Sequence, residues 1–485
     1  MADMKRDLIL RIVKALDAVL LAVPFGICWY MYYASRIVAP YFHKGNWVVL
    51  VLFVILYAFY GNLYNGFLVS WNRISEMVYS QALAAAVSDF IMYIVIWLLT
   101  KYLPNPLPLL AAFACQILLA GVWFSIANRW YFATFPPKRT AVVYDMRQGL
   151  EDVLHEYGLG KKFDILATVN IADCLADIDM LKDMDTVFLS GIHSRDRNVI
   201  LKYCIASGIN VYVIPRIGDV IMSGAQHRYI CHLPMLQVGR YNPSPGYLFI
   251  KRLLDIILSG AAVCILSPLL LITALAVKLE DGGPVFYRQK RLTKDGKEFD
   301  ILKFRSMRVD AEKDGIARLS TGAKDDRVTS VGRIIRKLRV DELPQLFCIL
   351  SGTMTIVGPR PERPEIAAQY EEEMPEFRLR LQAKAGLTGY AQVYGKYNTI
   401  PYDKLQLDLM YIAKPSIMED LRIMFATVRV LFLPESTEGI AEGQTTASKG
   451  GNPQDAAAEL LKEAAITVED KVSAEEPCNP QSISN

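Results

Sequence analysis

Two adjacent carboxylates, Asp341 and Glu342, stand in a short segment that also carries Arg336, Lys337 and Arg339. Adjacent side chains on a helix point about 100° apart, so the pair suits two separate roles better than one shared target. One carboxylate could attack a phosphorus atom while the other holds a metal ion, and the cations could neutralise phosphate oxygens. The segment therefore indicates phosphate chemistry.

Pro344 is expected to place both carboxylates at a junction between helices. Proline disfavours helical backbone at the preceding residue, Leu343, and is tolerated in the first turn of a following helix. An Asp or Glu just before such a helix is also an ordinary capping residue, and capping is the structural alternative to a catalytic role.

The surrounding sequence favours the catalytic interpretation. Arg360 lies between Pro359 and Pro361, and an arginine in so stiff a turn loses little entropy when it binds a phosphate. No histidine follows His232. Acid, base and nucleophilic chemistry in the second half of the chain must therefore rely on carboxylates.

These motifs resemble those of the bacterial sugar transferase family, the monotopic polyprenyl-phosphate hexose-1-phosphate transferases. The resemblance covers roughly Tyr247 to Leu433. It rests on Lys251-Arg252-Leu-Leu-Asp255, Ser267-Pro268, Gly283-Pro284-Val-Phe286, Arg288-Gln289, Lys303-Phe304-Arg305-Ser306-Met307, Asp341-Glu342-Leu-Pro344-Gln345-Leu346, Gly358-Pro359-Arg360-Pro361, Gly386-Leu-Thr388-Gly389 and Ala391-Gln392-Val-Tyr-Gly395.

The resemblance implies transfer of hexose-1-phosphate, galactose or glucose, from a UDP-sugar to undecaprenyl phosphate with release of UMP. This reaction would initiate capsule, exopolysaccharide or O-antigen synthesis. Asp341 would form a covalent aspartyl phosphosugar, and Glu342 would hold Mg²⁺ together with diphosphate oxygens. A catalytically inert membrane scaffold, or a regulator that senses a nucleotide, is the alternative function.

Further residues receive roles from the resemblance and from their charge. The residues expected to contact phosphate or substrate are Arg288, Lys303, Arg305, Gln345 and Arg360, and those expected at the lipid phosphate or the membrane are Lys251, Arg252, Ser267 and Pro268.

Composition places the chain at a membrane. Its 485 residues are 52% hydrophobic, and the mean hydropathy of +0.22 is too high for an ordinary soluble enzyme. A net charge of +3, without a basic stripe interleaved with aromatic residues, argues against nucleic acid as a partner. The eight cysteines show no metal-ligand spacing and are expected to be reduced.

The first part of the chain, residues 1–135, is predicted to be a four-helix transmembrane bundle. Basic residues gather before the first apolar stretch and after the fourth, so both ends of the bundle are expected in the cytoplasm of a bacterium, with the catalytic domain on the cytoplasmic face of the inner membrane. The stretches approach a span of about 20 residues and cover Ile12–Tyr33, Trp47–Val69, Ala82–Leu99 and Leu107–Ile126.

Residues 138–240 are predicted to form a Rossmann-like α/β domain on the cytoplasmic side. The turn after its first strand, Asp145–Gly149, lacks the glycines that let a backbone approach a pyrophosphate, so a structural or regulatory role is favoured over nucleotide binding. Symmetry makes a homodimer through this domain or the bundle the expected assembly. The predicted parallel strands are Thr140–Tyr144, Phe163–Thr168, Asp185–Leu189 and Asn210–Ile214.

Residues 247–433 are predicted to be a mixed, mainly α monotopic catalytic domain that begins with a membrane helix. Leu253–Leu279 is apolar enough to span, but Ser267-Pro268 interrupts it midway. A re-entrant helix keeps Asp341 with the cytoplasmic nucleotide sugar, whereas a Pro-kinked span is the alternative.

Two further expectations concern the end of the chain. Lys404, Asp408 and Tyr411 lie at helical spacing and could line the pocket or pair with one another. Residues 434–485 are predicted to be a disordered tail with at most a short helix near 456–465, because small and polar residues dominate there.

Overall fold

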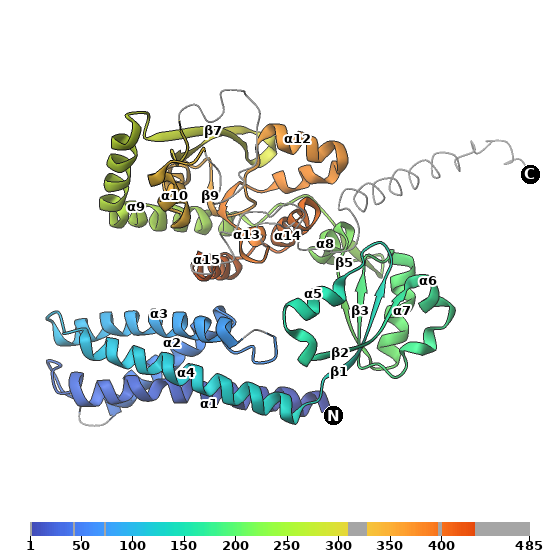
Figure 1. Ribbon diagram of the computed structural model, residues 1–485, viewed down its shortest axis with the longest axis horizontal. Coiled ribbons are helices and arrows are strands. Elements are labelled where there is room, and N and C mark those ends of the chain that lie inside the picture. Colours follow the sequence, from blue (N-terminus) through green and yellow to red (C-terminus); the bar gives the residue numbers. More distant parts are fainter. Residues whose placement is uncertain (1, 42–43, 72–73, 309–326, 396–399, 432–485) are drawn as a thin grey trace, which may run out of the picture.

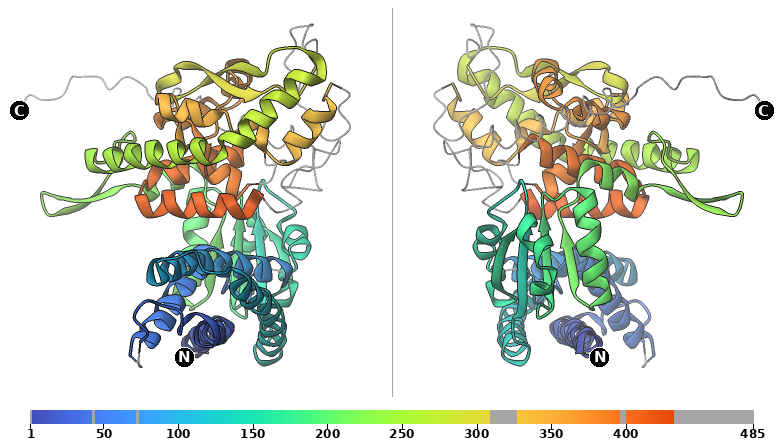
Figure 2. Two further views of the ribbon diagram at one scale, coloured as in Figure 1. Left: turned by 90° about the vertical axis from the view of Figure 1, so that its left-hand side faces the viewer. Right: turned by 90° about the vertical axis from the view of Figure 1, so that its right-hand side faces the viewer.

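The computed structural model describes residues 2–41, 44–71, 74–308, 327–395 and 400–431. The predicted tail, with its short helix, lies outside these residues. Figures 1 and 2 show three parts: a bundle of long helices at the N-terminal end, a small sheet flanked by helices, and a larger C-terminal part.

Long helices form the N-terminal bundle, and their bounds are α1 (Ala2–Cys28), followed by the π-helix η1 (Trp29–Tyr33), α2 (Lys44–Leu63), α3 (Ile74–Thr100) and α4 (Leu107–Thr134). Within the described residues, α2, α3, α4 and α9 (Pro245–Asp281) are each long and apolar enough to cross a membrane. The first predicted span is not among them. The C-terminal half of α1 is apolar, but Arg11, Lys14 and Asp17 lie in its middle.

The bundle encloses polar groups as well as stacked aromatic rings. The rings of Phe25 and Phe53 are parallel with centroids 4.4 Å apart. Beside them, the buried carboxylate of Asp17 accepts hydrogen bonds from Gln81 Nε2 at 2.9 Å and Tyr57 Oη at 3.3 Å. Asp89 on α3 is buried too. Polar contacts between helices therefore add to apolar packing in this bundle.

The middle part is built around a parallel sheet with strand order β2-β1-β3-β4. Its core is apolar, with Ala141, Val143, Val187 and Leu189 almost fully buried. The parallel sheet predicted from sequence is confirmed. Its strands are β1 (Lys138–Tyr144), β2 (Phe163–Asn170), β3 (Thr186–Ser190) and β4 (Asn210–Val213), and its helices are α5 (Leu150–Glu156), η2 (Leu159–Lys161), α6 (Ile171–Ala176), η3 (Ile178–Leu181), α7 (Ser194–Ala206) and α8 (Ile217–Ser223).

A hairpin leads from this sheet into the C-terminal part, where short helices surround two small sheets. The hairpin pairs β5 (Gln226–Ile230) with β6 (Leu233–Gln237). The remaining elements after α9 are β7 (Phe286–Leu292), η4 (Lys294–Gly296), β8 (Glu298–Phe304), α10 (Ser330–Lys337), η6 (Val340–Glu342), α11 (Gln345–Ser351), β9 (Thr355–Val357), α12 (Pro364–Glu373), η7 (Pro375–Gln382), β10 (Gly386–Thr388), α13 (Tyr390–Val393), α14 (Pro401–Ala413) and α15 (Ile417–Leu431).

Helix α9 changes direction along its length, as Figure 1 shows at the edge of the C-terminal part. Pro268 lies within it, and Ser267 Oγ donates to the carbonyl of Cys264 at 2.8 Å. Proline removes a helical hydrogen bond, which is a known cause of such bends. Both ends of α9 contact the same folded part: Arg252 donates to the carbonyls of α11, and Val277 packs beside α10.

The three parts touch one another through specific side chains. Arg147, in the turn after β1, forms a bidentate pair with Asp403 of α14, with both N–O distances 2.9 Å. Lys162 lies with its Nζ 3.2 Å from the centre of the Trp71 ring, which belongs to the turn after α2. Phe425 of α15 packs against aromatic side chains of the same region.

Asp255 on α9 links the membrane helix to strand β9, and we expect this link to stabilise the fold. Its buried carboxylate accepts from Thr355 Oγ1 at 2.7 Å and from the Ile356 amide at 2.9 Å. Asp255→Ala removes the acceptor of the buried Thr355 hydroxyl and of the partly buried Ile356 amide, and should cost about 2–3 kcal/mol of unfolding free energy. Thermal unfolding in detergent measures the loss, with Glu376→Ala on the surface as control. Equal melting temperatures for the two variants would contradict this.

Candidate active site

Asp341 and Glu342 lie on the 3₁₀ turn η6, between helices α10 and α11. The predicted helix junction is confirmed. The break itself lies upstream of the expected place, because Arg339 adopts a left-handed conformation (φ 52°) and ends α10. Leu343, expected to avoid the helical region, has φ −57° and ψ −35°. Its amide continues the turn with a bond to the carbonyl of Val340.

The capping alternative does not describe this pair. Pro344 occupies the N-cap position of α11, and Arg339 occupies that of η6. Neither carboxylate holds a cap position at this junction, so both side chains remain for other contacts.

Two cations meet on one oxygen of Glu342. Lys303 Nζ, from β8, lies 3.1 Å from Oε1, and Arg360 Nη2 lies 3.0 Å from the same atom. The structure therefore brings together four residues that the sequence analysis placed in the site: Lys303, Asp341, Glu342 and Arg360. The Lys303 and Glu342 side chains are each about one-fifth exposed, whereas Arg360 is 44% exposed.

The two carboxyl groups differ in acidity. Burial, and then the negative charge of Glu342, raise the pKa of Asp341 to about 6. Burial alone would raise the pKa of Glu342, but the charges of Lys303 and Arg360 outweigh it and hold that pKa well below its usual range. Neutral pH therefore leaves both groups ionised, with Asp341 the more basic of the two.

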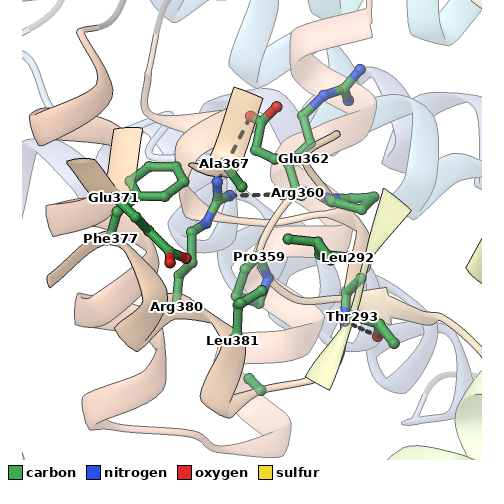
Figure 3. A pocket seen from close by; sticks show the side chains of 13 residues that line it. Leu292, Thr293, Pro359, Arg360, Glu362, Ala367, Glu371, Phe377, Arg380 and Leu381 are labelled. Carbon is green, nitrogen blue, oxygen red and sulfur yellow. Dashed lines mark hydrogen bonds and ion pairs between the residues drawn. The ribbon is translucent and has the colours of Figure 1, made fainter. Parts of the chain in front are cut away.

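Arg360 projects from a turn, residues 359–361, that we call the PRP turn. The Gly386 amide donates to the Pro359 carbonyl at 2.9 Å, and Arg291 Nη1 donates to the Pro361 carbonyl at 3.1 Å. A Cβ on Gly386 would collide with the backbone of Gly358, so the close approach of these segments requires glycine. Figure 3 shows the pocket beside the turn, lined in part by Leu292, Thr293, Pro359, Arg360, Glu362 and Arg380.

Three further residues, Arg288, Arg305 and Gln345, were predicted to contact phosphate. Arg305 is buried and pairs with Asp281 at the end of α9. Arg288 is exposed on β7 opposite Leu302, one residue from Lys303, and successive strand side chains face opposite ways. Gln345 is buried at the first residue of α11. The roles given to these three residues remain predictions.

The residues predicted at the lipid phosphate have partners within the protein. Lys251 Nζ lies 2.9 Å from Asp420 Oδ2 and 3.1 Å from the Tyr411 hydroxyl. Arg252 donates to the carbonyls of Ile349 and Leu350 at 2.7 and 2.8 Å. These contacts bind α9 to the rest of the C-terminal part, and a lipid phosphate would have to share or replace them.

A magnesium ion fits this site if the substrate completes its shell. The described residues hold no cluster of three or more His, Cys, Asp or Glu that could bind a metal by themselves. Mg²⁺ commonly takes one or two carboxylates plus substrate phosphate oxygens. Ionised Glu342, with Asp341 next to it, matches that donor set.

The sequence did not reveal that Arg291 and Arg380 bind the backbone of the PRP turn. Of Lys404, Asp408 and Tyr411 on α14, Asp408 forms an ion pair with Arg380 and Tyr411 hydrogen-bonds to Asp420. Lys404 and Asp408 also attract each other electrostatically, as their helical spacing suggested. Asp408 was visible at helical spacing, whereas no sequence signal singled out Arg380 or Arg291. Arg380 and Arg291 each contact a backbone carbonyl of the turn. Every residue has such a carbonyl, so the type of the accepting residue does not reveal the contact.

A bent apolar helix, a carboxylate pair and clustered cations are features expected of a membrane-associated site that handles phosphate groups. Comparison with known proteins gives the family: the bacterial sugar transferase family matches residues 246–434. Similar proteins include an exopolysaccharide production protein of Rhizobium leguminosarum, 41% identical over 37% of this chain and 94% of its own length. The chain belongs to the bacterial sugar transferase family.

Two further relatives carry more specific names. A UDP-glucose:undecaprenyl-phosphate glucose-1-phosphate transferase of Caulobacter vibrioides is 40% identical over 38% of this chain and 71% of its own. A UDP-N-acetylgalactosamine-undecaprenyl-phosphate N-acetylgalactosaminephosphotransferase of Aeromonas hydrophila is 40% identical over 48% of this chain. The alignment spans about half, 54%, of the Aeromonas protein.

Proposed function

We propose that this protein transfers a sugar 1-phosphate from a UDP-sugar to undecaprenyl phosphate and releases UMP, as the initiating step of surface polysaccharide synthesis. The observation that carries the proposal is the ionised Glu342 held by Lys303 and Arg360 beside Asp341, a carboxylate of raised pKa. The names of the relatives agree with this reaction class. They include glucose and N-acetylgalactosamine, so the choice of glucose or galactose remains a prediction.

The proposed chemistry has two in-line steps. A carboxylate oxygen of Asp341 attacks the sugar-linked phosphorus, and the bond from that phosphorus to the bridging oxygen breaks, with the electron pair leaving on UMP. An oxygen of undecaprenyl phosphate then attacks the same phosphorus, and Asp341 leaves as a carboxylate. Each step exchanges one phosphoryl anhydride for another, so no other source of energy is needed.

Arg360 and Lys303 supply positive charge where the phosphoryl group gains negative charge. Both are fixed by Glu342 before substrate arrives, and such preorganised charges contribute most when they need not move during reaction. Glu342, with substrate oxygens, would hold Mg²⁺, which neutralises the leaving diphosphate oxygens when bound.

The proposed site faces the cytoplasm, with α9 entering and leaving the same side of the bacterial inner membrane. Support comes from its two ends, since Asp255 binds β9 and Asp281 binds Arg305 within one folded part. A straight span would carry these ends to opposite faces. Re-entrance through the bend at Pro268 keeps the site with the nucleotide sugar.

UMP exchange tests the covalent mechanism. In membranes without polyprenyl phosphate, we expect the protein to move labelled UMP into UDP-sugar, because UMP leaves before the lipid reacts. The assay should include UDP-glucose, UDP-galactose and their N-acetyl forms, with Asp341→Asn as the blank. Exchange that needs added lipid phosphate would favour direct transfer in a ternary complex. UMP release from no sugar in the panel, even with lipid phosphate, would favour the inert scaffold.

A further inference from the structure

The Arg360 side chain is 44% exposed and lies with its Nη2 3.0 Å from Glu342 Oε1, so the backbone that carries it must be held in place for this contact to form. The carbonyl of Arg360 has a buried partner. Arg380 Nη2, from η7, donates to this oxygen at 2.7 Å, and Arg380 is only 3% exposed. Figure 3 shows this guanidinium with its interactions to Arg360 and Glu362.

Arg380 also lies beside two carboxylates. Its Nη2 lies 2.7 Å from Oδ2 of Asp408 on α14, and its Nη1 lies 3.7 Å from Glu362. Asp408 is 1% exposed. Burying two charges is costly, and apolar residues of similar volume often stabilise a fold as well or better. The ion pair therefore calls for a role that apolar packing could not fill.

The planar guanidinium of arginine can fill such a role, because its donors point in fixed directions. One guanidinium can bind a carboxylate and a carbonyl in fixed directions at once, which a lysine ammonium cannot reproduce. We propose that Arg380, anchored by Asp408, is a positioning residue that fixes the PRP turn and thereby aims Arg360 at Glu342 and the substrate phosphate. This inference rests on the proposed function for its kinetic consequence, and on the contacts alone for its structural one.

A double-mutant cycle tests the kinetic consequence. Arg380→Lys keeps the charge opposite Asp408 but loses the fixed geometry, so kcat/KM for UMP release should fall about tenfold. If Arg380 acts through Arg360, the same change in an Arg360→Ala background should cost less than twofold. Arg378→Lys, on the exposed face of the same element, is the matched control and should leave activity unchanged. Effects that multiply across the cycle would overturn the proposal.

A second variant covers the case in which Arg380→Lys folds poorly. The pair Arg380→Met with Asp408→Leu removes both charges together and leaves no buried charge unpaired. It should melt near the temperature of the unmodified protein and still lose about tenfold in kcat/KM. Full activity in this folded variant would show that packing alone holds the turn.

Hydrogen exchange gives an answer that does not need activity. In Arg380→Lys, amides of residues 356–363 should exchange about tenfold faster, while peptides from β1 to β4 should match the unmodified protein. Unchanged exchange at the turn would overturn the positioning role. If the unmodified protein releases no UMP, the proposed function fails, and exchange at the turn alone decides the role of Arg380.

Discussion

Asp341→Asn should reduce UMP release at least about a thousandfold, because the amide keeps the shape of the carboxylate but cannot attack phosphorus. The loss should appear in UMP release and UMP exchange alike, since both need the covalent step. Asp300→Asn is a suitable control, because Asp300 is an exposed carboxylate on β8, outside the site. It should retain full activity.

The melting temperature of Asp341→Asn shows whether its loss of activity is due to the missing nucleophile or to unfolding. The pKa of Asp341 is raised to about 6 in the folded protein, so the folded state binds this proton more tightly than the unfolded chain does. Ionising Asp341 therefore weakens the fold as pH rises from about 4 to 6. The amide carries no such cost, so the Asp341→Asn variant should melt at the same temperature or higher at pH 8. A variant that keeps its turnover would remove Asp341 from the nucleophile role.

The parts of the site that could be predicted are contiguous in the sequence. Asp341 and Glu342 stand side by side, and Arg360 is marked by its two prolines. The parallel strands were also predictable, because each is a short apolar run that alternates along the chain with a helical segment. Lys303 was predicted from resemblance, and only the structure shows its Nζ 3.1 Å from Glu342.

What sequence could not supply were partners far apart in the chain. Lys251 was expected at a lipid phosphate because a basic residue at a membrane interface suits one. The structure gives it Asp420, 169 positions later, as a buried partner. Arg380 was invisible for a related reason, since its acceptor is the backbone carbonyl of Arg360. Such pairings depend on how α9, η7, α14 and α15 pack, and no local pattern encodes that packing.

Helix α1 illustrates a different limit. Its predicted membrane span began at Ile12, yet charges at Lys14 and Asp17 lie on the same helix. The structure buries Asp17 against Gln81 and Tyr57. A hydropathy window counts such a charge as a cost, because it cannot know that neighbouring helices supply donors.

The first half-reaction should depend on pH through Asp341 alone. With its pKa raised to about 6, the nucleophile is protonated progressively below pH 6, and kcat/KM for UMP release should fall about tenfold per pH unit there. At pH 4 the rate should be about a hundredfold below its plateau. Glu342 stays ionised throughout this pH range, because Lys303 and Arg360 hold its pKa well below the usual value.

Single-turnover UMP release without lipid is the right measurement, because the second pKa of a phosphate monoester also lies near 6 and would confuse a full assay. The charge of Glu342 is one cause of the raised pKa, so Glu342→Gln should lower the midpoint as well as the plateau. Melting curves at each pH show that the protein stays folded. A midpoint near 4 would mean that Asp341 is unperturbed, and a two-proton slope would mean that a second carboxylate must ionise for the reaction.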